Sequence, residues 1–185
     1  NTVAGFEDNF DSYTSHDLPP CWNKIIRNAD PISFIGVEFK GITMYAATSN
    51  SAADVILVCP KVSTLNDASY ILKLDIESSN VIEVGTVNNV LSNAVFTKIT
   101  EFMPKGKEVS LSLPYSGTDQ FIALRMKTVD PASSQYAGIN SASWSTTLSN
   151  NEFSLSGMTY YPNPVKDVLN ISHVAAITSV SIYNM

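Results

Sequence analysis

Short segments rich in Val, Ile, Phe and Tyr recur along the chain, and turn-forming residues separate them. In one of them Val109, Leu111 and Leu113 alternate with two serines, which is the period-two pattern of a strand with one buried face. No segment predicts a helix of more than a turn or two. Closely spaced strands joined by short turns predict an all-β fold, an antiparallel jelly-roll β-sandwich. The clearest predicted strands are Val55–Val62, Ser69–Ser78, Val81–Val87, Ala94–Phe102, Lys107–Tyr115 and Gln120–Thr128.

The composition supports a β-protein that works outside the cytosol. Of 185 residues, 44% are hydrophobic and 15% are charged, whereas an average soluble domain has about 25% charged residues. The net charge is −6, and the eleven basic residues are spread thinly. Nucleic-acid binding requires clustered Lys and Arg, so we expect no nucleic-acid partner. No apolar run reaches the ~20 residues of a transmembrane helix.

The polar composition changes near the end of the chain and divides it into three parts. Residues 1–144 carry the strand pattern of the jelly roll. Residues 145–157 are small and polar and predict a linker. Strand-like patterning resumes in 158–185, which we expect to be the beginning of a small β-domain, because two strands alone make only a marginal unit. The chain begins with Asn, which fits either a mature protein after signal removal or an internal boundary.

A search for catalytic groups gives little. The two histidines, His16 and His173, belong to different modules, and no nucleophile elbow, phosphate loop or dinucleotide fingerprint occurs. A glycosidase needs two carboxylates across a cleft. Asp75 and Glu77 share the polar side of one strand, which favours a solvated face, and Glu83 is the third carboxylate that a hydrolase would use. We therefore expect no enzyme, with a polysaccharide hydrolase as an alternative.

Aromatic residues offer a second kind of chemistry. A β-sandwich binds sugars through flat aromatic faces and nearby polar groups. Trp22 and Tyr45 are candidates for this role, although the sequence favours a core position for Trp22. The ligand-binding candidates are Tyr115 and Tyr136, which lie beside loops, and Trp144, for which packing inside the final strand is the alternative.

Two cysteines and an acidic segment leave alternatives open. Cys21 and Cys59 form either a disulfide or two buried free thiols. The segment from Glu7 through Asp8 to Asp11 supplies either calcium ligands or a solvated acidic loop, because calcium takes carboxylate and carbonyl oxygens.

The tail from Phe153 to Met185 resembles the C-terminal sorting domain of proteins exported by the type IX secretion system of Bacteroidota. The motif is Tyr161, Pro162, Asn163 and Pro164, followed by an apolar strand and by "SIYN". The sequence stops before the glycine and last strands of that family, so we expect residues 158–185 to be a truncated sorting domain. The resemblance implies the type IX machinery as a partner, passage through the periplasm, and release or attachment at the cell surface.

The body resembles the MAM-like jelly-roll domains of the cleaved adhesin and choice-of-anchor J families. The resemblance lies in "FDSYTSHDLPPCW", "DVILVCPKVSTL", "IEVGTVNNVLSNAVFTKITEF" and "YSGTDQFIALRMKT". It implies a calcium site with Asp11 at the position of the family's opening Glu and Asn140 at the position of the family's Asp. Because Asn is neutral, the site has less negative charge than in the family.

These families imply a secreted or cell-surface, non-catalytic binding or adhesion module that recognises a glycan or a surface protein. A structural subunit of an extracellular assembly and an accessory domain of a secreted hydrolase are the alternatives.

Overall fold

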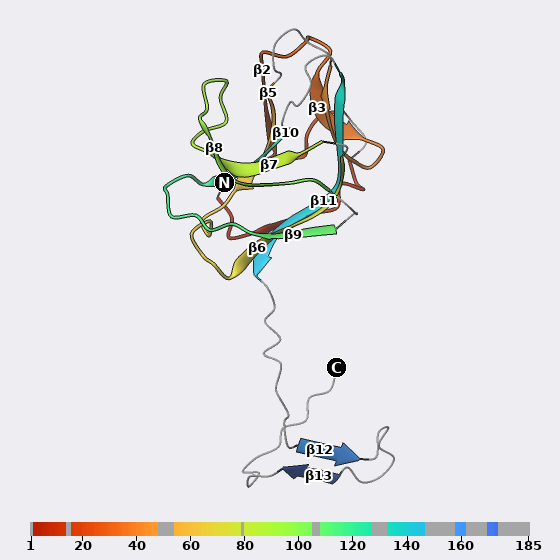
Figure 1. The fold of residues 1–185 in the computed structure, drawn as a ribbon, viewed down its shortest axis with the longest axis vertical. Coiled ribbons are helices and arrows are strands. Elements are labelled where there is room, and N and C mark those ends of the chain that lie inside the picture. Colours follow the sequence, from red (N-terminus) through yellow and green to blue (C-terminus); the bar gives the residue numbers. More distant parts are fainter. Residues whose placement is uncertain are drawn as a thin grey trace. The chain divides into compact units, whose positions relative to one another are not determined.

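The computed structural model describes residues 2–13, 16–47, 54–78, 80–104, 108–126 and 133–146, and the backbone of 158–161 and 170–173 (Figure 1). The chain divides into two compact units, Asn1–Thr147 and Leu148–Met185. Among the described residues no helix is long and apolar enough to cross a bilayer. The first unit is a jelly-roll β-sandwich of two antiparallel sheets, which confirms the predicted all-β fold.

One sheet has six strands in the order β3-β4-β11-β6-β9, and β1 pairs with β11 beyond the end of β4. The long strand β11 joins the two halves, with β4 on its first part and β1 on its last part. A bulge at Asn140 separates these parts. The strand bounds are β1 Phe6–Asp8, β3 Phe34–Glu38, β4 Gly41–Ala46, β6 Tyr70–Ser78, β9 Glu108–Ser112 and β11 Gln135–Thr146.

The other sheet has five strands in the order β2-β5-β10-β7-β8. Its central strand β10 pairs with β5 on one side and with β7 on the other. The bounds are β2 Asn23–Arg27, β5 Asp54–Lys61, β7 Ile82–Val87, β8 Phe96–Phe102 and β10 Phe121–Met126.

The main hydrophobic core lies between the sheets and takes side chains from both of them. Ile42 and Leu72 come from the six-stranded sheet and Leu57 from the five-stranded sheet, and all three are fully buried. Trp22 is 6% exposed and meets the rings of Phe6 and Phe10 edge to face, with centroids 5.5 and 5.3 Å apart. This confirms the core position predicted for Trp22 and closes one end of the sandwich.

A second apolar cluster covers the outer face of the five-stranded sheet. It contains the buried residues Ile25, Ile56, Val58, Val87, Ala94 and Ala123, with Val90, Phe96 and Phe121 packed against them. Residues 88–95, which connect β7 to β8, supply the cover. The loop is closed by the Val95 N–H, which donates to Asn88 Oδ1 at 3.0 Å. Strands β5 and β7 of this sheet are therefore buried on both faces.

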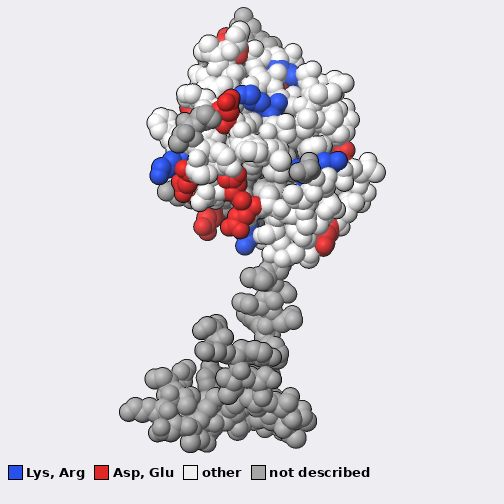
Figure 2. All heavy atoms as spheres, turned by 180° about the vertical axis from the view of Figure 1, so that it is seen from behind, with Lys and Arg blue, Asp and Glu red and all other residues white. Residues whose placement is uncertain are grey.

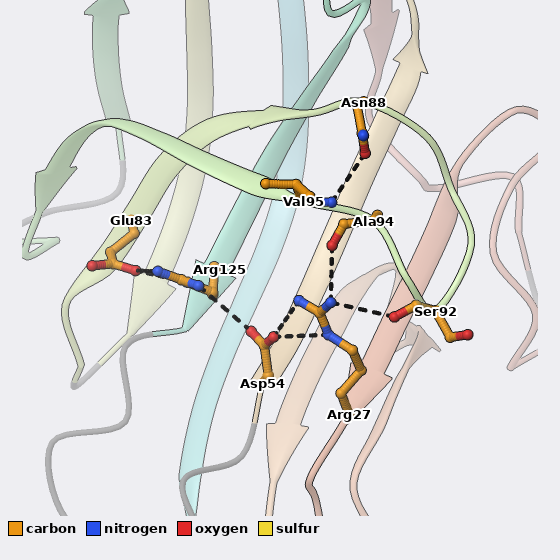
Figure 3. Close-up of polar contacts among 8 residues, drawn as sticks. All are labelled: Arg27, Asp54, Glu83, Asn88, Ser92, Ala94, Val95 and Arg125. Atoms are coloured by element: carbon orange, nitrogen blue, oxygen red, sulfur yellow. Dashed lines mark hydrogen bonds and ion pairs between the residues drawn. The ribbon is translucent and has the colours of Figure 1, made fainter.

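A chain of alternating charges fastens this cover to the sheet (Figure 3). Arg125 binds Glu83 through Nε at 2.7 Å and Nη2 at 2.6 Å, and its Nη1 lies 3.8 Å from Asp54. Asp54 also accepts hydrogen bonds from Arg27, whose Nη1 donates to the carbonyl oxygen of Ala94 at 2.9 Å. The sequence analysis did not identify this network, because its partners come from four different strands and one loop.

The six strands predicted from Val55 to Thr128 all occur as β5 to β10. Four strands before them were not predicted, namely β1 to β4. The predicted linker began too early, because β11 continues through Ser145 and Thr146, which pair with Ile71 and Tyr70 of β6. In the second unit, Met158–Tyr161 (β12) and Asn170–His173 (β13) form an antiparallel pair. The remaining predicted linker residues and the predicted "SIYN" segment of the tail lie outside the described residues.

Candidate functional site

The outer face of the six-stranded sheet is open and polar. In β6 the side chains of Leu72, Leu74 and Ile76 enter the core, so Lys73, Asp75 and Glu77 point outward. A groove of about 360 Å³ lies on this face. Strands β1, β11, β6 and β9 all contribute to it, and its lining residues are Glu7, Asp8, Asn9, Lys73, Leu74, Asp75, Glu108, Val109, Ser110, Ser141, Ala142 and Ser143.

Strand register brings these polar side chains into rows across the sheet. Ser143 is paired with Glu7 on one side and with Lys73 on the other. In the next row Ser141 is paired with Asp75, which is in turn paired with Glu108. The groove therefore presents serine hydroxyls and carboxylates in parallel rows, with one ammonium group among its lining residues.

The groove is rich in hydrogen-bond acceptors. Four of its lining residues, Glu7, Asp8, Asp75 and Glu108, carry carboxylates, against the single cation Lys73. Asp75 Oδ1 is buried and has no hydrogen-bond partner among the described residues, although buried polar atoms are ordinarily paired. Figure 2 shows a largely uncharged surface on which acidic side chains gather on one side of the view. Such a site suits a ligand that donates hydrogen bonds.

Tyr136 lies two strand positions from Gly138 on the same outer face, and it is 44% exposed. A Cβ atom placed on Gly138 would lie 2.6 Å from the Tyr136 hydroxyl oxygen and 3.3 Å from its ring carbon Cζ. The ring therefore runs along the sheet with its hydroxyl end over the space that Gly138 leaves empty, and the side chain is partly open to solvent. Across the strand pair, Tyr45 packs against Phe34 and donates a hydrogen bond to Ser134 Oγ at 3.2 Å.

The other two ligand candidates have structural roles. Trp144 is 1% exposed, stacks on Tyr70 and donates from Nε1 to Thr64 Oγ1 at 2.9 Å, so its assignment as a ligand contact was wrong. It points inward because Ser143 and Ser145 occupy the outward positions of β11. Tyr115 is half-buried against the core, and its hydroxyl accepts the Asp119 N–H at 2.7 Å. Of the three candidates, only Tyr136 presents a free aromatic face.

The two cysteines do not form a disulfide, which was one of the two alternatives. Both are free thiols, with Cys21 exposed and Cys59 fully buried. Cys59 sits inside β5 with its side chain in the main core, whereas Cys21 is on the surface beyond Trp22, and a disulfide requires closely apposed side chains. Burial raises the pKa of the Cys59 thiol well above its ordinary value, which makes it unreactive.

The calcium prediction stays a prediction. Among the described residues no group of three or more His, Cys, Asp or Glu side chains is arranged to hold a metal ion. Asp8 accepts the Phe10 N–H at 2.9 Å, and the Asp11 N–H donates to Asn9 Oδ1 at 3.3 Å. Asn140, the other predicted ligand, is an exposed residue at the bulge of β11.

The three carboxylates considered for a hydrolase do not share one site. Asp75 and Glu77 lie on the open face of β6, but Glu83 lies on the other sheet and is 6% exposed. Glu83 is bound by Arg125, with Lys98 Nζ 3.7 Å away. Its carboxylate therefore stabilises the five-stranded sheet. His16 is an exposed loop residue, as expected, with Nδ1 3.6 Å from Glu38. His173 ends β13, in the other unit, and its side chain lies outside the described residues.

Sequence reasoning missed most of the groove. Its polar residues occupy outward positions in strands where buried and exposed residues alternate, namely Lys73, Ser110, Ser141 and Ser143. That alternation was the available signal. The sorting motif is described only in part, since Tyr161 is the last residue of β12 and residues 162–164 lie outside the described residues.

Comparison with known proteins gives a structural likeness. No family model matches the chain, and no curated protein sequence matches it. The K2 cleaved adhesin domain of Lys-gingipain is similar in structure, with 13% identity, a TM-score of 0.54, and coverage of 77% of this chain and 100% of that domain. This likeness shows a shared β-sandwich fold.

Two carbohydrate-binding modules resemble the chain more loosely. The family 29 module CBM29_1 from Piromyces equi has 8% identity and a TM-score of 0.49, over 80% of this chain and 94% of that module. A mutant of the module CBM29-2 has 12% identity and a TM-score of 0.48, over 71% of this chain and 86% of that module.

Proposed function

We propose that the protein is a secreted or cell-surface, non-catalytic binding module whose open sheet face binds a glycan. The observation that carries this proposal is Tyr136, a 44% exposed aromatic residue whose ring reaches over Gly138 on the sheet face that also holds the polar groove. The five-stranded sheet offers no comparable surface, because its own loop covers it. The fold shared with an adhesin domain supports a binding role in general terms.

The chemistry of this face suits a sugar. The C–H groups of a pyranose ring pack against a flat aromatic face, and its hydroxyl groups need hydrogen-bond partners around the rim. Tyr136 supplies the aromatic face. The carboxylates of Asp75 and Glu108 accept hydrogen bonds from hydroxyl groups, and Ser141 and Ser143 both donate and accept.

The charge of the groove selects among glycans. With four carboxylates and one lysine among its lining residues, the groove repels an acidic polysaccharide and accepts a neutral or amine-bearing one. We propose this class of ligand in place of uronic-acid polymers.

Two further parts of the proposal rest on the sequence. The tail beginning near Met158 directs export through the type IX secretion machinery and delivers the module to the cell surface. Asp11 and Asn140 hold a structural calcium ion of modest affinity, because one carboxylate and one amide give the site little charge.

A glycan array tests the proposal. Matched oligosaccharides should be included: chitosan fragments with free amines, the same fragments N-acetylated, and oligogalacturonides. We expect binding to neutral or amine-bearing sugars, weaker binding to oligogalacturonides, and a smaller difference at high salt.

Three variants locate the site. Tyr136→Ala should lower the affinity about tenfold, whereas Tyr136→Phe keeps the ring and should retain most of it. Leu91→Ala is the matched control, because Leu91 is 63% exposed but lies on the loop that covers the other sheet. Equal losses in Tyr136→Ala and Leu91→Ala would contradict the site. Absence of binding to every glycan would contradict the function and favour a protein partner. Cleavage of a bound oligosaccharide would show a hydrolase instead.

A further inference from the structure

The hairpin between β3 and β4 turns through two residues that are poorly suited to the turn. Glu38 is paired with Gly41, so Phe39 and Lys40 form a two-residue loop. Both have left-handed backbones, with φ of 52° and 64°, which is the signature of a type I′ turn. Such turns favour Asn and Gly, and a bulky residue at positive φ is strained. The local backbone therefore disfavours Phe39.

The exposure of the Phe39 side chain to solvent also contributes nothing to the stability of the fold. It is 95% exposed, the highest value among the exposed large hydrophobic residues of the described chain. Neither core burial nor turn geometry accounts for a phenylalanine at this position. Backbone strain held by the surrounding structure is characteristic of ligand-contacting positions.

A hollow with mixed apolar and polar walls lies beside this ring. Its volume is about 350 Å³, and its lining residues are Tyr13, His16, Val37, Glu38, Phe39 and Lys40. The walls thus combine an exposed aromatic ring with an ammonium, a carboxylate and an imidazole. An aromatic surface with hydrogen-bonding groups around it is the combination already found at Tyr136.

The turn is continuous with the groove. Gly41 follows Lys40 directly, and a Cβ placed on Gly41 would lie 3.3 Å from Asn140 Oδ1. Asn140 precedes Ser141, which lines the groove. Gly41 and Tyr45 lie on the same strand four residues apart, so the turn and Tyr136, which pairs with Tyr45, are separated by about 13 Å along the sheet.

We infer that the Phe39–Lys40 turn is a second contact for the glycan bound at Tyr136. Phe39 stacks on a sugar ring, and Lys40 and Glu38 bind hydroxyl groups of the same sugar. This inference rests on the proposed function and adds that the ligand is an extended oligosaccharide, because a single sugar does not reach both aromatic rings.

The double substitution Phe39→Asn with Lys40→Gly separates this role from folding. It installs the residues that a type I′ turn favours, so the melting temperature should rise by about 2–8 °C. Removal of the ring should weaken binding about three- to tenfold. The probe is a size series, from two to six sugars, of the oligosaccharide type that binds the wild-type protein best on the array, measured by calorimetry. The loss should appear with the hexasaccharide and be absent with the disaccharide.

The outcomes separate this inference from the proposed function. Phe39→Tyr keeps the aromatic ring and should bind like the wild type. If Tyr136→Ala weakens binding but the Asn-Gly turn does not, the inference is wrong and the proposed function stands. A lower melting temperature would also overturn it, because the turn would then serve folding. If the wild-type protein binds no oligosaccharide, both proposals fail.

Discussion

The two sheets of the sandwich share a core but differ on their outer faces. The outer face of the five-stranded sheet is covered by residues 88–95, forms a second apolar cluster, and has its charges paired from Lys98 through Glu83 to Arg125. The outer face of the six-stranded sheet has a groove lined by polar residues and an exposed Tyr136. Among the described residues, the groove on the second face gathers the polar groups that a ligand could contact.

The difference follows from the strand sequences. In β5 the run from Val55 to Cys59 is buried throughout, and successive side chains enter the two apolar clusters alternately. In β6, by contrast, Leu72, Leu74 and Ile76 alternate with charged residues. A continuous apolar run marks a strand covered on both faces, and alternation marks one with a solvated face. The location of the open face is therefore encoded in strand patterning.

The largest effect on stability should come from truncating a side chain in the apolar cluster on the covered face. Ile56 is fully buried in the second cluster, and Ile56→Ala should reduce the free energy of unfolding by about 2–5 kcal/mol. Lys73→Ala, at an outward position of β6, should change it by less than about 0.5 kcal/mol. Urea unfolding of both variants measures the difference. Similar values for the two would show that the outer apolar cluster contributes little to stability.

The next effect should come from the paired charges of the covered face. Glu83→Gln removes the carboxylate that binds Arg125 and should reduce the free energy of unfolding by about 2–3 kcal/mol, because a partly buried guanidinium loses its charged partner. Glu77→Gln makes the same change on the open face, where Glu77 is exposed, and should be nearly neutral. Thermal unfolding of the pair decides this, and a neutral Glu83→Gln would mean that solvent already screens the ion pair.

Much of the fold could be predicted from the sequence. The strands from Val55 onward are apolar, regularly spaced and bounded by turn residues. The hairpin of β3 and β4 was missed, because Phe39 and Lys40 carry no turn signal and the run from Phe34 to Ala46 offers no clear break. The presence of Phe and Lys where a type I′ turn favours Asn and Gly thus has two consequences: it strains the backbone, and it leaves the turn without a sequence signal.

Of the predicted ligand-binding residues, only Tyr136 is exposed on the open face. Glu7, Asp8 and Asp75, which line the groove, were named in the sequence analysis only for calcium or for catalysis. Alternation places Lys73 and Ser143 on outward faces, but it does not show that they are neighbours, since that depends on a register between strands about 70 residues apart. The Tyr136–Gly138 pair was visible in principle, because residues two apart share a strand face. The structure adds that the ring lies over the glycine.

The sharpest test of the open face, with only a small change in stability, should come from Gly138→Ala. The new methyl group would meet the outer end of the Tyr136 ring, where the hydroxyl oxygen lies 2.6 Å from the Cβ position. An exposed side chain can lift away, so the free energy of unfolding should change by less than about 1 kcal/mol. The displaced ring would no longer lie over residue 138, and affinity for the oligosaccharide found on the array should fall.

Gly117→Ala is the matched control for this test. A Cβ at Gly117 would lie 2.2 Å from the Tyr115 hydroxyl oxygen, but that hydroxyl accepts the Asp119 N–H in a half-buried site. Moving the Tyr115 ring breaks this hydrogen bond, so stability should fall by about 1–2 kcal/mol while affinity is unchanged. Loss of stability in Gly117→Ala and loss of affinity in Gly138→Ala would show that the Tyr115 ring stabilises a loop and the Tyr136 ring contacts a ligand. Unchanged affinity in Gly138→Ala would mean that the placement of the Tyr136 ring over Gly138 does not matter for binding.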